Sequence, residues 1–240
     1  FRGVAWSPDG TRLATIAPGR QKTNGELLVW SAVGGEELLL INGFTGGFFS
    51  VAWSPDGLML ASGCDLSWAA GAVKIWDSAT GEPIGVLKGE GYLHEVSWSR
   101  DGTLVESGIS YKAAQVWDAK TGKRLYTLGG REGSMVNVSW SPDGATLATG
   151  SRDGLIKLWD AGSGELLQTF EGRFPMVSCI SWCPDGNIIA AITGHRPALK
   201  IWNAKSGEPV YGIDDELSPR EEQSCDSDCW TYYRSTNMAW

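Results

Sequence analysis

A seven-residue block recurs along the chain and constrains its fold more than any other feature. VAWSPDG occupies residues 4–10 and again 51–57, and the variants VSWSRDG, VSWSPDG and ISWCPDG begin at residues 96, 138 and 180. The tryptophans of these five blocks are 47, 45, 42 and 42 residues apart. Such a period indicates a repeat architecture, in which each unit is one supersecondary structure that packs on its neighbours.

A second apolar run follows each block. It reads LLVWS, VKIWD, AQVWD, IKLWD and LKIWN, and its last residues are Ser31, Asp77, Asp118, Asp160 and Asn203. Short runs rich in Val, Ile, Leu, Trp and Thr alternate with Gly, Pro, Asp and Asn, which is typical of strands and turns. The fourth unit contains four such runs, MVNVSWS, ATLATGS, LIKLWD and ELLQTF. None of its connections is long enough to cross over a sheet, so neighbouring strands are expected to be antiparallel.

Four-stranded sheets of this kind bury both faces when they stack radially, which predicts an all-β fold, a β-propeller of four-stranded antiparallel blades. We expect five complete blades, at residues 1–43, 44–89, 90–130, 131–172 and 173–213. Residues 214–236 are expected to form an acidic inserted loop, and NMAW at 237–240 is expected to start a sixth blade.

The units resemble WD repeats, which combine Trp-Asp pairs such as Trp159-Asp160 with SPDG turns at this period; residues 138–172 carry the fullest match. The resemblance implies a fragment of a seven-bladed ring that serves as a noncatalytic scaffold or sensor. Bacterial-style repeats with WSPDG and TGE turns are often part of a longer multidomain chain with a kinase or a nucleotide-binding switch domain. One feature departs from the family: Phe44, Arg131 and Arg173 stand where WD repeats often bury a histidine, so we expect stability to rest mainly on apolar packing.

The five units share the same turn chemistry on one side of the propeller. In a meander of strands a to d, the a–b and c–d turns lie on one face, and the b–c and d–a loops lie on the other. Pro presets a type I turn, Asp bonds nearby amides and Gly takes the positive φ that follows. A catalytic residue is not needed five times, so we interpret these residues as structural: Asp9, Gly10, Asp56, Gly57, Asp101, Gly102, Asp143, Gly144, Asp185 and Gly186. Asp153, which stands between the second and third runs of the fourth unit, is also interpreted as a structural turn residue.

The opposite face varies between units. The two tryptophans of a unit are 24, 23, 19, 19 and 20 residues apart, so units one and two carry insertions between strands b and c. Variable loops on a rigid scaffold are where binding is usually built, and aromatic residues, Met and Arg are enriched at protein interfaces. The candidate partner-binding residues are Phe44, Phe48, Trp68, Tyr92, His94, Arg131, Met135, Arg173, Phe174, Met176 and Arg196. An alternative is that several of these aromatic side chains only plug the ends of blades.

Net charge and hydropathy indicate which classes of partner the chain is not expected to bind. The net charge is −8, which argues against nucleic acid as a partner. The excess is local, because the segment 214–230 holds seven acids and one base, and the rest of the chain is nearly neutral. No apolar run approaches the roughly 20 residues of a spanning helix, so no membrane partner is expected. The start FRGVAW lacks a signal segment, and we expect a cytoplasmic protein.

Five cysteines without a regular spacing predict reduced thiols. Cys225 and Cys229 in CDSDC make half a zinc site at best, so neither a metal nor another cofactor is predicted. The two histidines, His94 and His195, stand in no catalytic motif, and we expect a protein that is not an enzyme. The runner-up is an enzymatic or periplasmic propeller, either peptidase-associated or resembling the TolB translocation protein, with carboxylates or histidines converging on its central channel.

Overall fold

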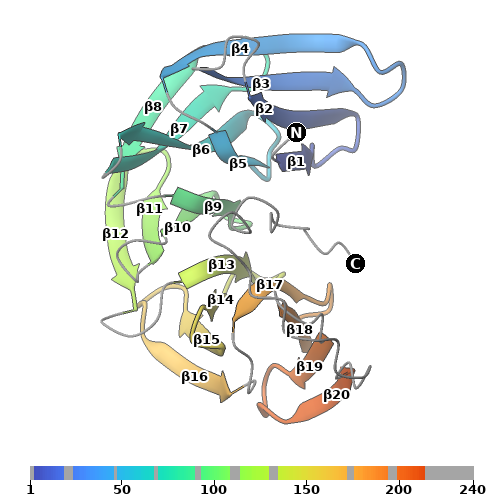
Figure 1. The fold of residues 1–240 in the computed structure, drawn as a ribbon, viewed down its shortest axis with the longest axis vertical. Helices are drawn as coiled ribbons and strands as arrows, with labels where there is room; N and C mark the ends of the chain where they lie inside the picture. Colours follow the sequence, from blue (N-terminus) through green and yellow to red (C-terminus); the bar gives the residue numbers. More distant parts are fainter. Residues whose placement is uncertain are drawn as a thin grey trace, which may run out of the picture.

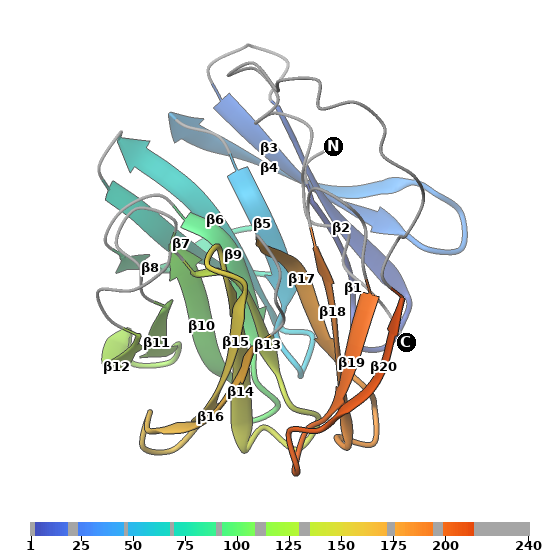
Figure 2. The ribbon, with the colours of Figure 1, turned by 60° about the horizontal axis from the view of Figure 1, so that its bottom comes forward.

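The structure is a computed structural model that describes residues 3–18, 24–45, 48–67, 70–89, 93–108, 114–129, 135–171, 176–193 and 199–213. Within these residues, twenty strands form five four-stranded antiparallel sheets, each with its strands in sequence order. Figure 1 shows the sheets as blades around a common centre, with the first strand of each blade innermost and the fourth outermost. Figure 2 shows the same blades tilted, each twisted along its strands. The predicted fold class and the five predicted meanders are confirmed.

The strands have the following bounds. Blade 1 contains β1 (Gly3–Trp6), β2 (Arg12–Pro18), β3 (Asn24–Ser31) and β4 (Glu37–Thr45), and blade 2 contains β5 (Phe48–Trp53), β6 (Met59–Ser67), β7 (Ala70–Asp77) and β8 (Pro83–Lys88). Blade 3 contains β9 (Leu93–Trp98), β10 (Thr103–Gly108), β11 (Ala114–Asp118) and β12 (Lys123–Leu128). Blade 4 contains β13 (Met135–Trp140), β14 (Thr146–Ser151), β15 (Leu155–Asp160) and β16 (Leu166–Glu171), and blade 5 contains β17 (Val177–Trp182), β18 (Ile188–Thr193), β19 (Leu199–Asn203) and β20 (Pro209–Ile213).

The boundary expected between residues 43 and 44 is wrong by two residues. Strand β4 continues to Thr45, and Phe44 pairs with Gly25 in the sheet of blade 1. The residues inserted into the first unit lengthen β3 at its beginning, so β4 has a partner strand for two further residues. The acidic segment 214–236 and the predicted sixth blade at 237–240 lie outside the described residues.

The hydrophobic core is divided into clusters that each join two successive blades. Between blades 3 and 4, for example, Ala114, Val116 and Leu128 pack with Val138, Leu147 and Trp159. We call the face that a blade turns to its successor its outgoing face, and the face that it turns to its predecessor its incoming face. The other clusters join blades 1 and 2, 2 and 3, and 4 and 5 in the same way. Each blade therefore buries its apolar residues only against its neighbours.

In blades 2 to 5 the tryptophan of the repeated block also makes a hydrogen bond to the preceding blade. Its indole nitrogen donates to a carbonyl of the preceding innermost strand: Trp53 to Ala5 at 3.0 Å, Trp98 to Ala52 at 3.3 Å, Trp140 to Ser97 at 3.3 Å and Trp182 to Ser139 at 3.0 Å. The spacing of the repeats comes from this tryptophan, and the bond explains why the same side chain is needed in each successive blade.

The second tryptophan of three units makes a hydrogen bond within its own blade. Trp30 donates to the Thr15 hydroxyl at 2.8 Å, Trp76 to that of Ser62 at 2.9 Å, and Trp159 to that of Thr149 at 2.9 Å. The expectation that stability rests mainly on apolar packing was therefore incomplete, because each of these buried or partly buried donors has a polar partner.

Candidate functional site

In the a–b turns, the aspartate carboxylates accept hydrogen bonds from residues of the same turn. In blade 1 the Ser7 hydroxyl donates to Asp9 Oδ1 at 2.6 Å, and the Thr11 backbone N–H donates to the same oxygen at 3.0 Å. The Arg12 N–H in turn donates to the Ser7 hydroxyl at 2.9 Å. The Ser–Asp bond recurs between Ser54 and Asp56 at 2.6 Å, Ser99 and Asp101, and Ser141 and Asp143 at 2.6 Å.

These bonds lower the pKa of the turn aspartates. The Ser7 hydroxyl, followed by the Thr11 amide, lowers the pKa of Asp9 to about 2. Asp56, Asp101 and Asp143 have lowered pKa values chiefly because of the corresponding serine, and Asp185 chiefly because of the Asn187 N–H. A carboxylate held in the ionised form by its own turn has a structural role and is a poor general acid or base at neutral pH.

The glycines of the turns adopt the backbone conformation that the sequence predicted. Gly10, Gly57, Gly102, Gly144 and Gly186 have φ values of 70°, 70°, 87°, 75° and 75°. In the c–d turns, Asp77 accepts from the Ala79 and Thr80 N–H groups at 3.0 and 2.8 Å, and the same arrangement recurs at Asp118, Asp160 and Asn203. This face, which we call the turn face, therefore follows from local turn chemistry.

Asp153 is the one predicted turn residue on the opposite side. It accepts from the Ser151 hydroxyl and from the Leu155 N–H, the latter at 3.1 Å, and Gly154 follows it with φ 81°. Its b–c turn between β14 and β15 thus uses the same chemistry as the a–b turns.

The opposite face, which we call the loop face, carries the differences between blades. In blade 4 the b–c pairing ends at Gly150 and Ile156, whereas blade 1 adds two further pairs, ending at Pro18 and Gly25. Blade 2 extends similarly, to Ser67 and Ala70. Part of the inserted sequence therefore lengthens the b–c hairpins of blades 1 and 2, where the sequence alone suggested longer loops.

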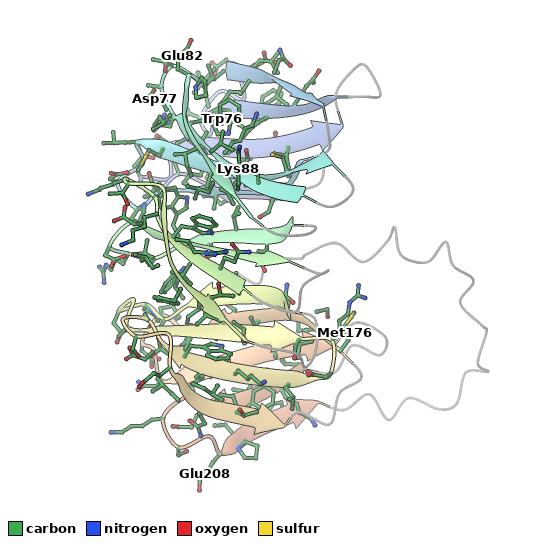
Figure 3. The ribbon with its side chains drawn as sticks, turned by 90° about the vertical axis from the view of Figure 1, so that its left-hand side faces the viewer. Trp76, Asp77, Glu82, Lys88, Met176 and Glu208 are labelled. Carbon is green, nitrogen blue, oxygen red and sulfur yellow. The ribbon has the colours of Figure 1, made fainter. Side chains whose placement is uncertain are left out.

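The structure places five of the eleven candidate residues at the loop face. Met176 is partly buried just before β17, and Figure 3 shows it on the opposite side of the molecule from Asp77, Glu82 and Glu208. The backbones of Phe44, Phe48, His94 and Met135 lie at strand ends that adjoin the d–a loops. The other candidates, Trp68, Tyr92, Arg131, Arg173, Phe174 and Arg196, lie outside the described residues, so their grouping stays a prediction.

One carboxylate on an innermost strand was not identified from the sequence. Glu95 of β9 accepts from the Val138 N–H at 3.1 Å and from Asn137 Nδ2 at 3.2 Å, and both donors belong to blade 4. Burial raises the pKa of this carboxyl to about 7, against the lowering effect of the two hydrogen bonds. Ser50 stands at the equivalent position of blade 2 and accepts from the Val96 N–H at 3.3 Å. A charged residue at this position of the innermost strand is the sequence signal by which Glu95 could have been identified.

The described residues contain no group of three or more His, Cys, Asp or Glu side chains that could hold a metal ion. Cys64, Cys179 and Cys183 are in no disulfide, whereas Cys225 and Cys229 lie outside the described part of the chain. No helix in that part of the chain is long and apolar enough to cross a membrane.

Comparisons with known proteins agree with this geometry. The family model described as WD domain, G-beta repeat matches residues 35–77, 122–160 and 164–203, together slightly more than half of the chain. No curated protein matches. A chain in the "Crystal Structure of Mitotic Checkpoint Complex" has a TM-score of 0.77 at 24% identity, over 89% of this chain and 63% of that one. The present chain thus spans less than two thirds of the solved chain and shares its fold. By the matched repeats, the chain belongs to the WD40 family of WD domain, G-beta repeats.

Proposed function

We propose that this chain is a noncatalytic interaction module that binds a protein or peptide on its loop face. Propellers of the WD40 family are commonly scaffolds for protein interactions. The observation that supports the loop face is the contrast between the two sides of the molecule: the turn face repeats one hydrogen-bonded turn, while the b–c hairpins of the loop face differ in length between blades.

A surface that repeats in every blade presents five similar binding sites to a partner, whereas an irregular surface presents a single distinct site. The turn aspartates are already bonded to their own turns, so they have little capacity left for a partner. The longer hairpins of blades 1 and 2 add backbone and side chains that no other blade has. Loops of unequal length on a rigid scaffold are the usual means by which such a fold becomes specific.

The proposal also covers the class of partner, the cellular location of the chain and its noncatalytic role. The chain has an acidic balance, which disfavours nucleic acid, and we place it in the cytoplasm as a piece of a larger multidomain protein with a kinase or nucleotide-binding switch domain. The solved chain of similar fold was crystallised as part of the Mitotic Checkpoint Complex, which agrees with a role in protein assembly. The catalytic alternative calls for carboxylates free in the channel, whereas Glu95 is bonded to blade 4.

Affinity capture with two matched double variants tests the proposed face. Arg173→Ala with Phe174→Ala changes the d–a loop between blades 4 and 5, and Leu58→Ala with Glu82→Ala changes exposed side chains of the turn face. We expect the first pair to reduce capture of the partner at least about tenfold and the second to leave it unchanged. Equal capture by both variants would refute the loop face, and turnover of a peptide or sugar by the purified chain would refute the noncatalytic role.

A further inference from the structure

One position of the innermost strands carries a charge in a single blade. The residues three before the tryptophan of each repeated block are, in chain order, Gly3, Ser50, Glu95, Asn137 and Cys179. Glu95 is the third residue of β9, and Asn137 is the third residue of β13. Both lie within two residues, along the chain, of the candidate binding residues His94 and Met135. Glu95 therefore lies near the end of its strand that adjoins the loop face.

The two oxygens of the Glu95 carboxylate differ in their hydrogen bonds. The side chain lies on the outgoing face of blade 3, where Oε2 accepts from both the Val138 N–H and Asn137 Nδ2 of blade 4. Within the described residues Oε1 accepts no hydrogen bond, and unlike Asn137 Oδ1 it is not a buried atom. The side chain as a whole is partly exposed. Blade 4 thus fixes the orientation of the carboxylate through one oxygen, and the other oxygen is accessible to a ligand.

The ionised form of Glu95 is unfavourable in this position. Desolvation is the largest effect on its pKa, which is raised to about 7, and no cation of the described residues is among the groups that shift it. A glutamine could accept the same two hydrogen bonds without a charge. Ionisable groups in such surroundings are enriched at functional sites, where a ligand of opposite charge offsets the unfavourable desolvation when it binds.

We propose that Glu95 binds a cationic side chain, that of an arginine or a lysine, of the protein or peptide that docks on the loop face. The inference rests on the proposed function and names the chemistry of the partner. An N–H of the guanidinium or ammonium group donates to Oε1, while Oε2 keeps its bonds to Val138 and Asn137. A charge-assisted hydrogen bond of this kind is about twice as strong as a neutral one. Because the equivalent residues of the other blades are neutral, the bond also determines how the partner is oriented across the blades.

Selection from a random-peptide display library on the immobilised 240-residue chain supplies the probe for this site. We expect selected peptides that lose affinity for the Arg173→Ala, Phe174→Ala variant to share one basic position. Replacement of that arginine by citrulline, or of that lysine by norleucine, is expected to raise the dissociation constant at least about tenfold in isothermal titration calorimetry.

Glu95→Gln tests whether this basic residue contacts Glu95. The variant is expected to bind the original peptide at least about tenfold more weakly than the parent chain does, and to bind the original and the substituted peptide alike. Glu82→Gln makes the same substitution at an exposed residue of the turn face, and this matched control is expected to bind as the parent chain does. If thermal unfolding shows that Glu95→Gln is not folded, Glu95→Ser, which copies the residue of blade 2, takes its place.

Two results would overturn the role of Glu95 and leave the loop face in place. The peptides that need Arg173 and Phe174 could share no basic residue, or the substituted peptide could lose as much affinity for Glu95→Gln as for the parent chain. Peptides that are insensitive both to the double variant and to Glu95→Gln would overturn the loop face and the role of Glu95 together. A library that yields no binding peptide would do the same.

Discussion

The guanidinium carbon of Arg12 lies 4.5 Å from the centre of the Trp53 ring, across the boundary between blades 1 and 2. The same guanidinium donates to the Gly57 carbonyl at 3.2 Å and to the Ser78 carbonyl at 3.3 Å. One side chain of β2 thus contacts the innermost strand and both turns of the next blade. The equivalent residues of the other blades are Met59, Thr103, Thr146 and Ile188, so this link is specific to the first interface.

Arg12→Met should lower the free energy of unfolding by about 1–3 kcal/mol, because it removes the cation–π contact and the hydrogen bonds to Gly57 and Ser78 while keeping a side chain of similar length. Arg12→Lys keeps the charge but cannot bond both carbonyls in the same plane, so an intermediate loss is expected. Urea unfolding of the three proteins measures the difference. An Arg12→Lys variant less stable than Arg12→Met would contradict the role given to the charge.

Trp182→Phe should cost about 1–3 kcal/mol, since the Ser139 carbonyl loses its donor while most of the buried ring remains. Trp6→Phe is the matched control, because Trp6 occupies the same position of blade 1 and is largely exposed. Urea unfolding is expected to show little change for the control. Equal losses in both variants would mean that the bond between blades contributes nothing.

Acid should destabilise the fold through the turn aspartates. The native pKa of Asp9 is lowered from 3.8 to about 2, so its stabilising contribution is complete above pH 3.8 and is lost as the pH falls towards 2. Asp9→Asn is expected to reduce the slope of melting temperature against pH in this window. Pro8→Ala changes the same turn without a titratable group and is expected to leave the slope unchanged. An unaltered slope in Asp9→Asn would rule out this contribution.

Glu95 should have the opposite pH dependence. Its native pKa is raised from 4.5 to about 7, so the neutral carboxyl favours folding below pH 4.5, and this advantage is lost as the pH rises through 7. Glu95→Gln stays neutral and still accepts from Val138 and Asn137, and above pH 7 we expect it to be more stable than the parent by about 1–3 kcal/mol. Below pH 4.5 the two proteins are expected to unfold alike. A variant that is less stable above pH 7 would contradict the buried position of the carboxylate.

The sequence predicted the parts of the fold that depend on neighbouring residues in the chain. The four strands of the fourth unit were placed within about one residue, and the glycines of the a–b turns have the positive φ that their turn type requires. The boundary at residue 43 failed because the end of a strand depends on how far its partner strand extends, and the insertion that lengthens β3 also determines where β4 ends.

Contacts between blades were harder to predict. Trp53 donates to the Ala5 carbonyl, and Glu95 accepts from Asn137 and Val138. These hydrogen bonds depend on the position of one sheet relative to the next, which the repeat spacing does not give. The sequence shows that the tryptophan recurs at a fixed position of the unit. That it donates a hydrogen bond follows only from the structure, which shows the carbonyl of the preceding blade next to it. Of the candidate binding residues, Met176 lies on the side opposite Asp77 and Glu208, and its binding role stays a prediction because the composition of that surface depends on loop conformation.

Packing between successive sheets has a consequence for the order in which the backbone opens. Blade 3 has a neighbour on each side, whereas blades 1 and 5 each have one in the described part of the chain. In the 240-residue chain, local opening is therefore expected to start in blades 1 and 5 and to reach blade 3 last. Amide hydrogens of β2 and β18 are expected to exchange with deuterium before those of β10 and β11, so the exchange rates along the chain would report the distance of each strand from an end.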